Sequence, residues 1–172
     1  YIGALMSEVA GAEIPLPLPR MTYAEAMARY GSDKPDTRFD MELCTLSDTV
    51  RDCGFGVFDG ALEAGGLVVG IRVLGGAKLT RKEIDALGEY AKTYKAKGLA
   101  WHKLAEDGTA SSSFAKFLQP DTLAALLART GMEKGDLLLV IADGDIELAQ
   151  NAMGALRVEV ARRLDMIPQG KW

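Results

Sequence analysis

The sequence has 172 residues, of which 48% are hydrophobic and 26% are charged, and its formal net charge is −4. This composition is ordinary for a globular chain with a real core, and it argues against a free-standing nucleic-acid binder, which is usually basic. No apolar run is long enough to cross a membrane, so we expect a soluble, cytoplasmic protein. Cys44 and Cys53 match no zinc-ligand spacing, and we expect both thiols to stay reduced.

The first thirty residues alternate between helical and extended patterns. The sequence opens at Tyr1 as if in the middle of a helix, so we expect a fragment of a longer polypeptide. Alternating prolines over residues 14–19 then predict an extended segment, because proline cannot continue a helix. Thr22 and Glu25 have the spacing of a capping box and predict a helix that ends at Gly31.

A polar loop follows this helix and supplies the first candidate site. Pro35 restricts its backbone, and its charged side chains are close enough in sequence to pair with one another. Such a loop is costly to specify unless its shape matters, so it is either a shaped functional segment or an ordinary salt-bridged connector. Its candidate residues are Ser32, Asp33, Lys34, Asp36 and Arg38, with Lys34 and Arg38 able to pair with the two aspartates.

The central part of the chain predicts an α+β fold. Residues 67–74 form the clearest strand, and the fully apolar run 137–142 is consistent with a strand covered on both faces. Residues 99–105 predict another strand, with 114–118 as its partner. The simplest arrangement is a small antiparallel sheet with helices packed on one face.

Helices are predicted between these strands and after them. Thr80 and Glu83 form a second capping box, which begins a helix with an apolar stripe. Two more helices are expected over 121–130 and 146–164. The segment 55–61 is ambiguous between helix and strand.

Basic residues concentrate in one window, 70–104, which carries a net charge of +5 in an otherwise acidic chain. This excess is either an ordinary solvated helix face or a surface that lies near a polyanion. Aromatic residues nearby, such as Trp101 and Phe117, are expected in the core rather than stacked on bases, and so is Phe114. The candidate RNA-facing residues are Arg81, Lys82, Lys92 and Lys95.

No active site can be assigned from residue types and spacing. The single histidine, His102, has no partner at the spacing of a catalytic triad and is expected at the surface or on an edge strand. Residues 143–145 lack the glutamate that would complete a calcium loop, and we interpret them as a turn and helix cap. We therefore predict no catalytic, cofactor-binding or metal-binding residue in this chain.

The run 19–38 closely resembles bacterial aspartyl-tRNA synthetases. In that family a "RYGSDKPD-x-R" segment leaves the class II catalytic domain and enters an inserted GAD domain, which glutamyl-tRNA amidotransferase subunits share. Further matches follow in the family's order, and only Leu74 departs from the pattern, where proline is usual. They are the "F-x-V-F" of 55–58, the "IRV-x-GGA" of 71–77, the "RKEID" of 81–85 and the "AMGALR" of 152–157.

The resemblance implies a domain organisation and a parent reaction. It assigns 42–142 to the GAD insertion domain, 1–41 to a flank of the catalytic domain, and 143–172 to the helix that returns to that domain. The parent enzyme uses ATP and Mg²⁺ to activate aspartate, transfers it to tRNA, and forms a homodimer. The family's catalytic motifs have no counterpart here, so the chain itself is expected to be inactive and placed near the tRNA acceptor arm.

Two other interpretations remain open at this point. The chain could be a tRNA-related binding module of a glutamyl-tRNA amidotransferase subunit, or a generic interaction domain with no role in RNA binding. The run 19–38 separates the first from a synthetase fragment, because an amidotransferase insert should lack it.

Overall fold

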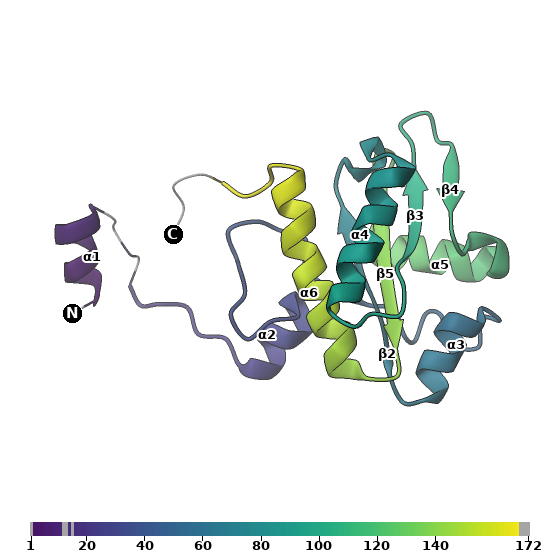
Figure 1. Ribbon diagram of the computed structural model, residues 1–172, viewed down its shortest axis with the longest axis horizontal. Coiled ribbons are helices and arrows are strands. Elements are labelled where there is room, and N and C mark those ends of the chain that lie inside the picture. The colour runs from purple at the N-terminus through teal and green to yellow at the C-terminus, as the bar shows by residue number, and fades with distance from the viewer. Residues whose placement is uncertain (1, 12–13, 15, 169–172) are drawn as a thin grey trace.

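The computed structural model describes residues 2–11, 14 and 16–168. The first helix, α1 (Ile2–Ala10), lies apart from the rest of the chain (Figure 1). Residues 16–22 then lead without regular secondary structure into α2 (Tyr23–Tyr30), where the predicted helix is confirmed. The predicted extended segment 14–19 is described except at residue 15, and residues 169–172 of the predicted return segment lie outside the described residues.

Five strands form one sheet in the order β1-β2-β5-β3-β4, and every neighbouring pair is antiparallel. Val140 of β5 sits at the centre, opposite Gly70 of β2 on one side and Ala100 of β3 on the other. The predicted α+β class with an antiparallel sheet is confirmed. The strands are β1 (Cys44–Thr45), β2 (Leu67–Val73), β3 (Ala100–Leu104), β4 (Ala110–Ser112) and β5 (Leu137–Asp143).

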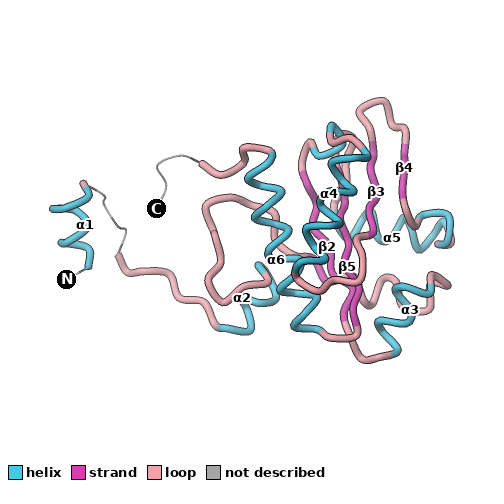
Figure 2. Tube along the Cα trace, viewed as in Figure 1, coloured by secondary structure: helices cyan, strands magenta, loops and turns pink. Residues whose placement is uncertain are grey.

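Helices cover both faces of this sheet, so the expectation of a single covered face was wrong. Figures 1 and 2 show α4 (Arg81–Thr93) and α6 (Ile146–Arg163) on one side, and α3 (Gly56–Glu63) and α5 (Pro120–Thr130) on the other. Successive strand residues point to opposite faces, so the consecutive buried residues 67–71 of β2 and 137–141 of β5 require a cover on each side.

The two faces bury separate hydrophobic clusters. The first core lies under α4 and α6 and includes Ile71 and Leu139 from the sheet and Met153 from α6. The second core lies under α3 and α5. It contains Phe58 and Phe114, whose ring centroids are 5.4 Å apart, among aliphatic side chains. The sheet therefore separates two hydrophobic interiors.

Side-chain hydrogen bonds decide where several elements begin and end. The capping box at Thr80 is confirmed, because Glu83 and Thr80 each accept a backbone N–H from the other. At Thr22 the side chain accepts the N–H of Glu25 at 3.2 Å, whereas the Glu25 carboxylate turns to Arg29 instead.

The predicted strand 114–118 was wrong. The actual partner of β3 is β4, and the chain then turns into the short 3₁₀ helix η2 (Ala115–Phe117). Ser112 Oγ causes this turn by accepting the N–H groups of Phe114 and Ala115, at 3.2 and 3.1 Å. The ambiguous segment 55–61 becomes α3, and a second 3₁₀ turn, η1 (Gly76–Lys78), precedes α4. Among the described residues, no helix has the length and apolar character needed to cross a bilayer.

Candidate functional site

The polar loop 32–38 begins where α2 meets α6. Gly31 ends α2 with a left-handed backbone (φ 64°), and its backbone lies directly against Gly154 of α6. A Cβ atom at Gly154 would come within 2.6 Å of the Tyr30 carbonyl oxygen, which no real packing allows. The two glycines therefore let the helices approach closely enough to fix the start of the loop.

Arg157 of α6 anchors the far end of the loop, although its side chain is almost completely buried, with 1% exposed. Its guanidinium donates to the carbonyl oxygens of Asp36 at 2.9 Å, Phe39 at 2.8 Å, Asp40 at 3.3 Å and Met41 at 2.8 Å. These bonds span four of six consecutive residues of the chain. The planar, forked donor set of arginine suits such a cluster of carbonyls.

Aromatic rings enclose the same guanidinium. Its Cζ atom lies 4.0 Å from the ring centroid of Phe39 and 4.9 Å from that of Tyr30. Burial lowers the pKa of Arg157, and the surrounding charges of Asp36 and Glu42 oppose that shift. An arginine remains protonated under these conditions, so Arg157 is a buried cation whose donors point at backbone oxygen atoms.

The candidate loop is partly paired within itself. Arg38 makes a two-pronged ion pair with Asp36, with Nε–Oδ1 at 2.9 Å and Nη2–Oδ2 at 2.7 Å. This guanidinium holds the pKa of Asp36 below its usual range. Ser32 Oγ accepts the backbone N–H of Lys34 at 3.1 Å. The expected pairing of Lys34 with Asp33 is not among the ion pairs of the described residues, and both side chains are exposed.

A second ion cluster ties α2 to the chain that enters β1. Arg29 bonds Glu42 through Nη2–Oε1 at 2.6 Å and Nε–Oε2 at 3.0 Å, and it bonds Glu25 at 2.8 Å. Arg29 therefore lowers the pKa of Glu42. Tyr30 OH also donates to Glu42, at 3.3 Å. The Arg29–Glu42 pair thus joins the chain before the loop to the chain after it, and Arg157 holds the end of the loop at residues 36–41.

A hollow of about 560 Å³ separates the loop from the C-terminal end of α4. Tyr94, which caps α4, lines it together with Ser32, Lys34 and Asp36 of the loop and Asn151 of α6. The hydroxyl groups of Tyr90 and Tyr94 lie 3.4 Å apart, and this contact raises the pKa of Tyr90 to about 12. The structure therefore brings the candidate loop beside one end of the candidate basic helix.

The four candidate basic residues do not form one patch. Arg81 and Lys82 begin α4, whereas Lys92 and Lys95 lie at its other end, roughly 16 Å away at 1.5 Å per residue. Arg81 pairs with Asp85 at 2.8 Å. Lys92 pairs with Glu89 at 2.7 Å, so half of the expected charge is locally neutralised. Lys82 and Lys95 are exposed and have no ion pair among the described residues.

The aromatic residues near the basic window differ in burial. Trp101 is 6% exposed and Phe114 is fully buried, which confirms both as core residues. Phe117 is 47% exposed, so its expected core position was wrong; it lies in the 3₁₀ turn η2 rather than in a strand. His102 is 2% exposed, so its expected surface position was wrong. Strand β3 is paired on both sides, and the ring of Phe114 lies 6.2 Å from that of His102, which together enclose the imidazole.

Sequence reasoning missed Arg157, although the sequence contains a signal for it. Met153, Leu156, Arg157 and Val160 follow the i, i+3, i+4, i+7 spacing of a buried helix stripe, and the arginine stands at a position where the pattern requires an apolar residue. A charged residue on such a stripe must find partners inside the protein. The carbonyl groups of 36–41 are those partners, and they could not be identified before the fold was known.

Metal-ligating side chains do not cluster among the described residues. No group of three or more His, Cys, Asp or Glu side chains within 2–11, 14 and 16–168 could hold a metal ion. The Asp36 carboxylate of the loop is already engaged by Arg38.

Comparison with known proteins gives one family match and several longer proteins that contain a similar segment. A family model described as "GAD domain" matches residues 58–153. An aspartate–tRNA(Asp/Asn) ligase of Symbiobacterium thermophilum is 51% identical over 171 residues, which is 99% of this chain and 29% of the relative. An aspartate–tRNA ligase of Agathobacter rectalis is 52% identical over 168 residues, covering 98% of this chain and 28% of the relative.

These matches confirm the resemblance found in the sequence. The alignment over 171 of 172 residues includes the run 19–38 as well as the insert-like centre. The chain spans less than a third of the length of these relatives.

Proposed function

The chain belongs to the GAD domain family, and from this premise we propose that it is the GAD-containing segment of an aspartate–tRNA ligase. The observation that carries the proposal is 51% identity over 99% of the chain to a protein of that name. The parent enzyme activates aspartate with ATP and Mg²⁺ and attaches it to tRNA in the cytoplasm. The segment itself supplies no catalytic group.

The proposal includes a division of the chain. Residues 42–142 form the insertion domain, while 1–41 and 143–172 are flanks that join the catalytic domain of the same polypeptide, which also forms the homodimer. Helix α6 supports a role as the connecting element, because it packs on the sheet through Met153 and on α2 through Gly154. The loop 32–38 begins directly after the contact between Gly31 and Gly154.

The loop has a structural role in this proposal and a second role near RNA. Arg157 and the Arg29–Glu42 pair hold its two ends, so it orders the junction between insert and catalytic domain. The exposed Lys34, on the rim of the hollow beside Tyr94, is then available to the acceptor end of tRNA. Lys95 is exposed and follows Tyr94 in sequence, so we include it in the proposed RNA-facing surface.

The amidotransferase alternative is not favoured. An amidotransferase insert should lack the run 19–38, whereas the alignment to the aspartate–tRNA ligases includes it. An aspartate–tRNA ligase is therefore the reference enzyme for testing the proposal.

A segment exchange tests the parent function directly. We would replace the equivalent segment of the Symbiobacterium thermophilum ligase with this chain and measure aspartylation of tRNA. Since the two segments are 51% identical, we expect kcat/KM within about tenfold of the parent enzyme, which corresponds to a loss of less than about 1.4 kcal/mol. A chimera that folds and dimerises but does not aspartylate tRNA would refute the proposal.

The RNA role of the loop needs its own variant. In the same chimera, Lys34→Ala should raise KM for tRNA several-fold, with a weaker dependence on salt, because one phosphate contact is lost. Lys116→Ala, an exposed lysine in η2 beyond the other face of the sheet, is the matched control and should change nothing. Unchanged aspartylation and tRNA affinity in Lys34→Ala would leave the loop with its structural role alone.

A filter-binding assay separates these proposals from a generic interaction domain. The isolated chain should bind tRNA weakly or not at all, and any affinity should fall as salt is raised, because contacts to phosphate release counterions. No binding by the isolated chain, together with unchanged tRNA affinity of the chimera when Lys34 is replaced by alanine, would favour a domain without any role in RNA binding.

A further inference from the structure

The hollow between the loop 32–38 and the C-terminal end of α4 contains more than the exposed Lys34 on its rim. Its volume of about 560 Å³ is of the order of a small-molecule site. An aromatic ring, an amide and a hydroxyl group line it, from Tyr94 at the end of α4, Asn151 of α6 and Ser32 of the loop. Sites for unpaired nucleotides use the same kinds of group, because rings stack on the base and polar side chains bond its edge.

One wall of the hollow is a single face of α6. Asn151, Gly154, Ala155 and Val158 all line it and follow the i, i+3, i+4, i+7 spacing of one helix face. Gly154 has no side chain and that of Ala155 is small, so the helix adds little bulk to the hollow. Asn151 is the only member of this face that can form side-chain hydrogen bonds with a ligand.

The two polar groups have hydrogen-bonding capacity left for a ligand. Asn151 is exposed, and its side chain makes no hydrogen bond to another described residue, so its amide can both donate and accept. Ser32 Oγ accepts the N–H of Lys34 at 3.1 Å, which leaves its own O–H free to donate. A base edge presents both donors and acceptors, which suits this pair of side chains.

Tyr94 supplies the aromatic surface. Its side chain is 43% exposed, whereas Tyr30, the other ring that lines the hollow, is buried. Tyr90 holds it in place, with ring centroids 5.5 Å apart and hydroxyl groups 3.4 Å apart. A ring that is already fixed loses little conformational freedom when a base stacks on it.

The charges around the hollow favour a phosphate group. Its charged lining residues are two cations and one anion, Lys34, Arg157 and Asp36. The Asp36 carboxylate is already paired with Arg38 at 2.7 Å. Lys34 is exposed and has no ion pair within the described part of the chain, so its ammonium is available to a phosphate.

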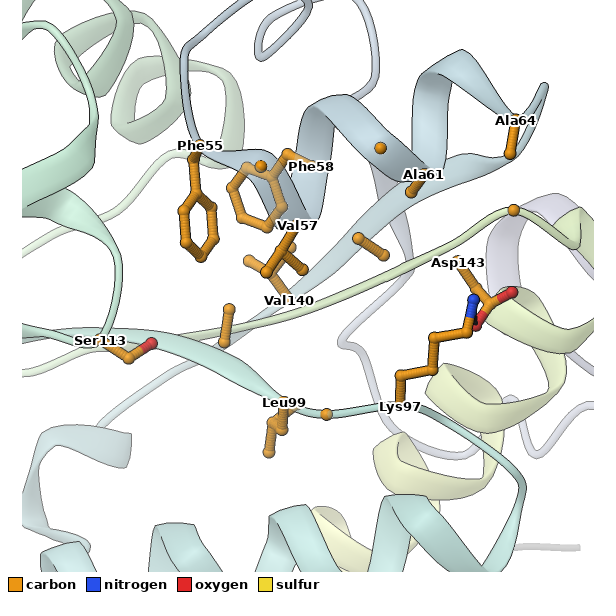
Figure 3. Close-up of a pocket in the computed structure, with 16 residues that line it drawn as sticks. Phe55, Val57, Phe58, Ala61, Ala64, Lys97, Leu99, Ser113, Val140 and Asp143 are labelled. Carbon is orange, nitrogen blue, oxygen red and sulfur yellow. Dashed lines mark ion pairs between the residues drawn. The ribbon is translucent and has the colours of Figure 1, made fainter.

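The apolar cavity on the other face of the sheet lacks such a set of groups. It has a volume of about 530 Å³ and lies between α3 and the ends of β3 and β5 (Figure 3). Its one hydroxyl group, that of Ser113, already accepts the N–H of Trp101 at 2.9 Å. Lys97 is paired with Asp143 at 3.6 Å. The polar side chains of that cavity are engaged within the protein, whereas those of the hollow are not.

We propose that the hollow binds one unpaired nucleotide of an RNA, an inference that rests on the RNA role of the loop proposed above. The base stacks on Tyr94, its edge bonds the Asn151 amide and the Ser32 hydroxyl, and its phosphate pairs with Lys34. A base inside a duplex does not enter, because it is stacked between its neighbours and its edge is paired. The hollow therefore selects a single-stranded segment or an unpaired end.

The test titrates three probes into the ¹⁵N-labelled full chain and follows them by NMR. Adenosine 5′-monophosphate should give saturable shifts of the amides at 32–36, 93–95 and 151–158. Ribose 5-phosphate has the phosphate without the base and should bind about tenfold more weakly, because stacking is lost. The single-stranded trinucleotide of adenosine should bind more tightly than the monophosphate, because its further phosphates can reach the exposed Lys95.

Two results of this titration would overturn the proposal. Equal affinity for adenosine 5′-monophosphate and ribose 5-phosphate, or no saturable shift with any probe, would show that the hollow does not recognise a base. A monophosphate that bound as tightly as the trinucleotide would show a site for free nucleotides instead of RNA.

Variants with matched controls assign the binding to residues. Tyr94→Ala should weaken binding of the trinucleotide about fivefold or more, whereas Tyr94→Phe keeps the ring and should bind like the wild type. Phe117→Ala, which removes a similarly exposed ring in η2, should change nothing. Asn151→Ala should weaken binding several-fold, and Gln119→Ala, an exposed amide before α5, is its control. Wild-type affinity in Tyr94→Ala would refute the proposal.

The chimeric ligase separates a failure of this inference from a failure of the proposed function. There Tyr94→Ala should raise KM for tRNA several-fold and change kcat little, because the lost contact forms on binding. A chimera that aspartylates tRNA with the same KM in Tyr94→Ala would overturn the nucleotide site and leave the proposed function standing. A chimera that aspartylates no tRNA would refute the proposed function, while the titration of the full chain would still decide whether the hollow binds a nucleotide.

Discussion

The two faces of the sheet differ in how completely a buried polar side chain is hydrogen-bonded. Under α4 and α6, the guanidinium of Arg157 is enclosed by four carbonyl oxygens and two aromatic rings. On the other face, both ring nitrogens of His102 are buried without a hydrogen-bond partner among the described residues. The same chain therefore contains one fully satisfied buried charge and, across the sheet, one buried group that lacks its hydrogen bonds.

This difference separates a structural centre from groups that cost stability. Arg157 joins α6 to a loop more than 110 positions earlier in the chain, so its bonds define the junction. The imidazole of His102, beside Phe114, makes no hydrogen bond to a described residue and carries the desolvation cost of the unmade bonds. Removing a buried polar group should therefore destabilise the first face and stabilise the second.

The largest effect is expected for Arg157→Ala. The change leaves several buried carbonyl oxygens without donors and opens a cavity between two rings, so it should lower the free energy of unfolding by about 3–5 kcal/mol. Urea titration of the purified chain would measure it. Arg162→Ala, in the same helix but 68% exposed in its pair with Glu159, is the matched control and should change stability by less than about 0.5 kcal/mol.

If Arg157→Ala lowered the free energy of unfolding no more than Arg162→Ala, the carbonyl cluster would be satisfied without the guanidinium, and the contrast between the two faces would not hold. Arg157→Lys tests the contribution of the guanidinium shape. Lysine keeps the charge but lacks the planar fork, so we expect a loss between those of the alanine variant and the wild type.

A somewhat smaller loss in the free energy of unfolding is expected for Gly154→Ala. The added methyl group would lie within 2.6 Å of the Tyr30 carbonyl oxygen and push α2 away from α6, which should cost about 1–3 kcal/mol. Gly88→Ala is the control, because the nearest atom to its Cβ is 3.7 Å away in Leu99. That change removes a glycine from the interior of α4 and should stabilise the chain by up to about 1 kcal/mol. A stabilised Gly154→Ala would show that the helices are not in close contact.

For His102→Leu we expect a gain in the free energy of unfolding rather than a loss. Leucine fills a similar volume in the second core without two unpartnered nitrogens, so the variant should be more stable at neutral pH by about 1 kcal/mol. A loss of stability at neutral pH would show that the imidazole has partners in solution.

The pH dependence of that variant gives a second measurement. Burial lowers the pKa of His102 in the folded chain. Between the unfolded value of about 6.5 and the lowered folded value, the unfolded chain binds more protons, so stability falls as the pH falls. His102 is the only histidine in the sequence, and His102→Leu should remove most of this decline when urea midpoints at about pH 7.5 and about pH 5.5 are compared.

The sequence predicted what depends on local periodicity. The apolar runs of β2 and β5, the capping box at Thr80 and the helices α5 and α6 were all found from patterns that span fewer than about twenty residues. The run 137–142 even indicated a strand covered on both faces, a signal that the expectation of helices on one face overlooked. The strand assigned to 114–118 failed because one serine hydroxyl redirects the chain.

The candidate site was predictable only in part, because its partners are distant in sequence. The pairing of Asp36 with Arg38 is local and followed from the loop itself. The contact of the loop with Arg157 joins positions about 120 residues apart, and the burial of His102 depends on both neighbours of β3. Neither could be derived until the order of the strands was known.

The smallest effects should come from the exposed pairs along α4, which test whether burial rather than charge makes Arg157 important. Lys92→Ala removes an exposed pair with Glu89 and should change the free energy of unfolding by less than about 0.5 kcal/mol. Arg81→Ala should cost slightly more, about 0.5–1 kcal/mol, because the Arg81 guanidinium also lies 4.9 Å from the ring of Trp101. Thermal unfolding at low and high salt would distinguish them, since screening weakens the ion pairs. If either variant approached the loss at Arg157, ion pairing alone would account for stability, and the contrast between buried and exposed guanidinium groups would fail.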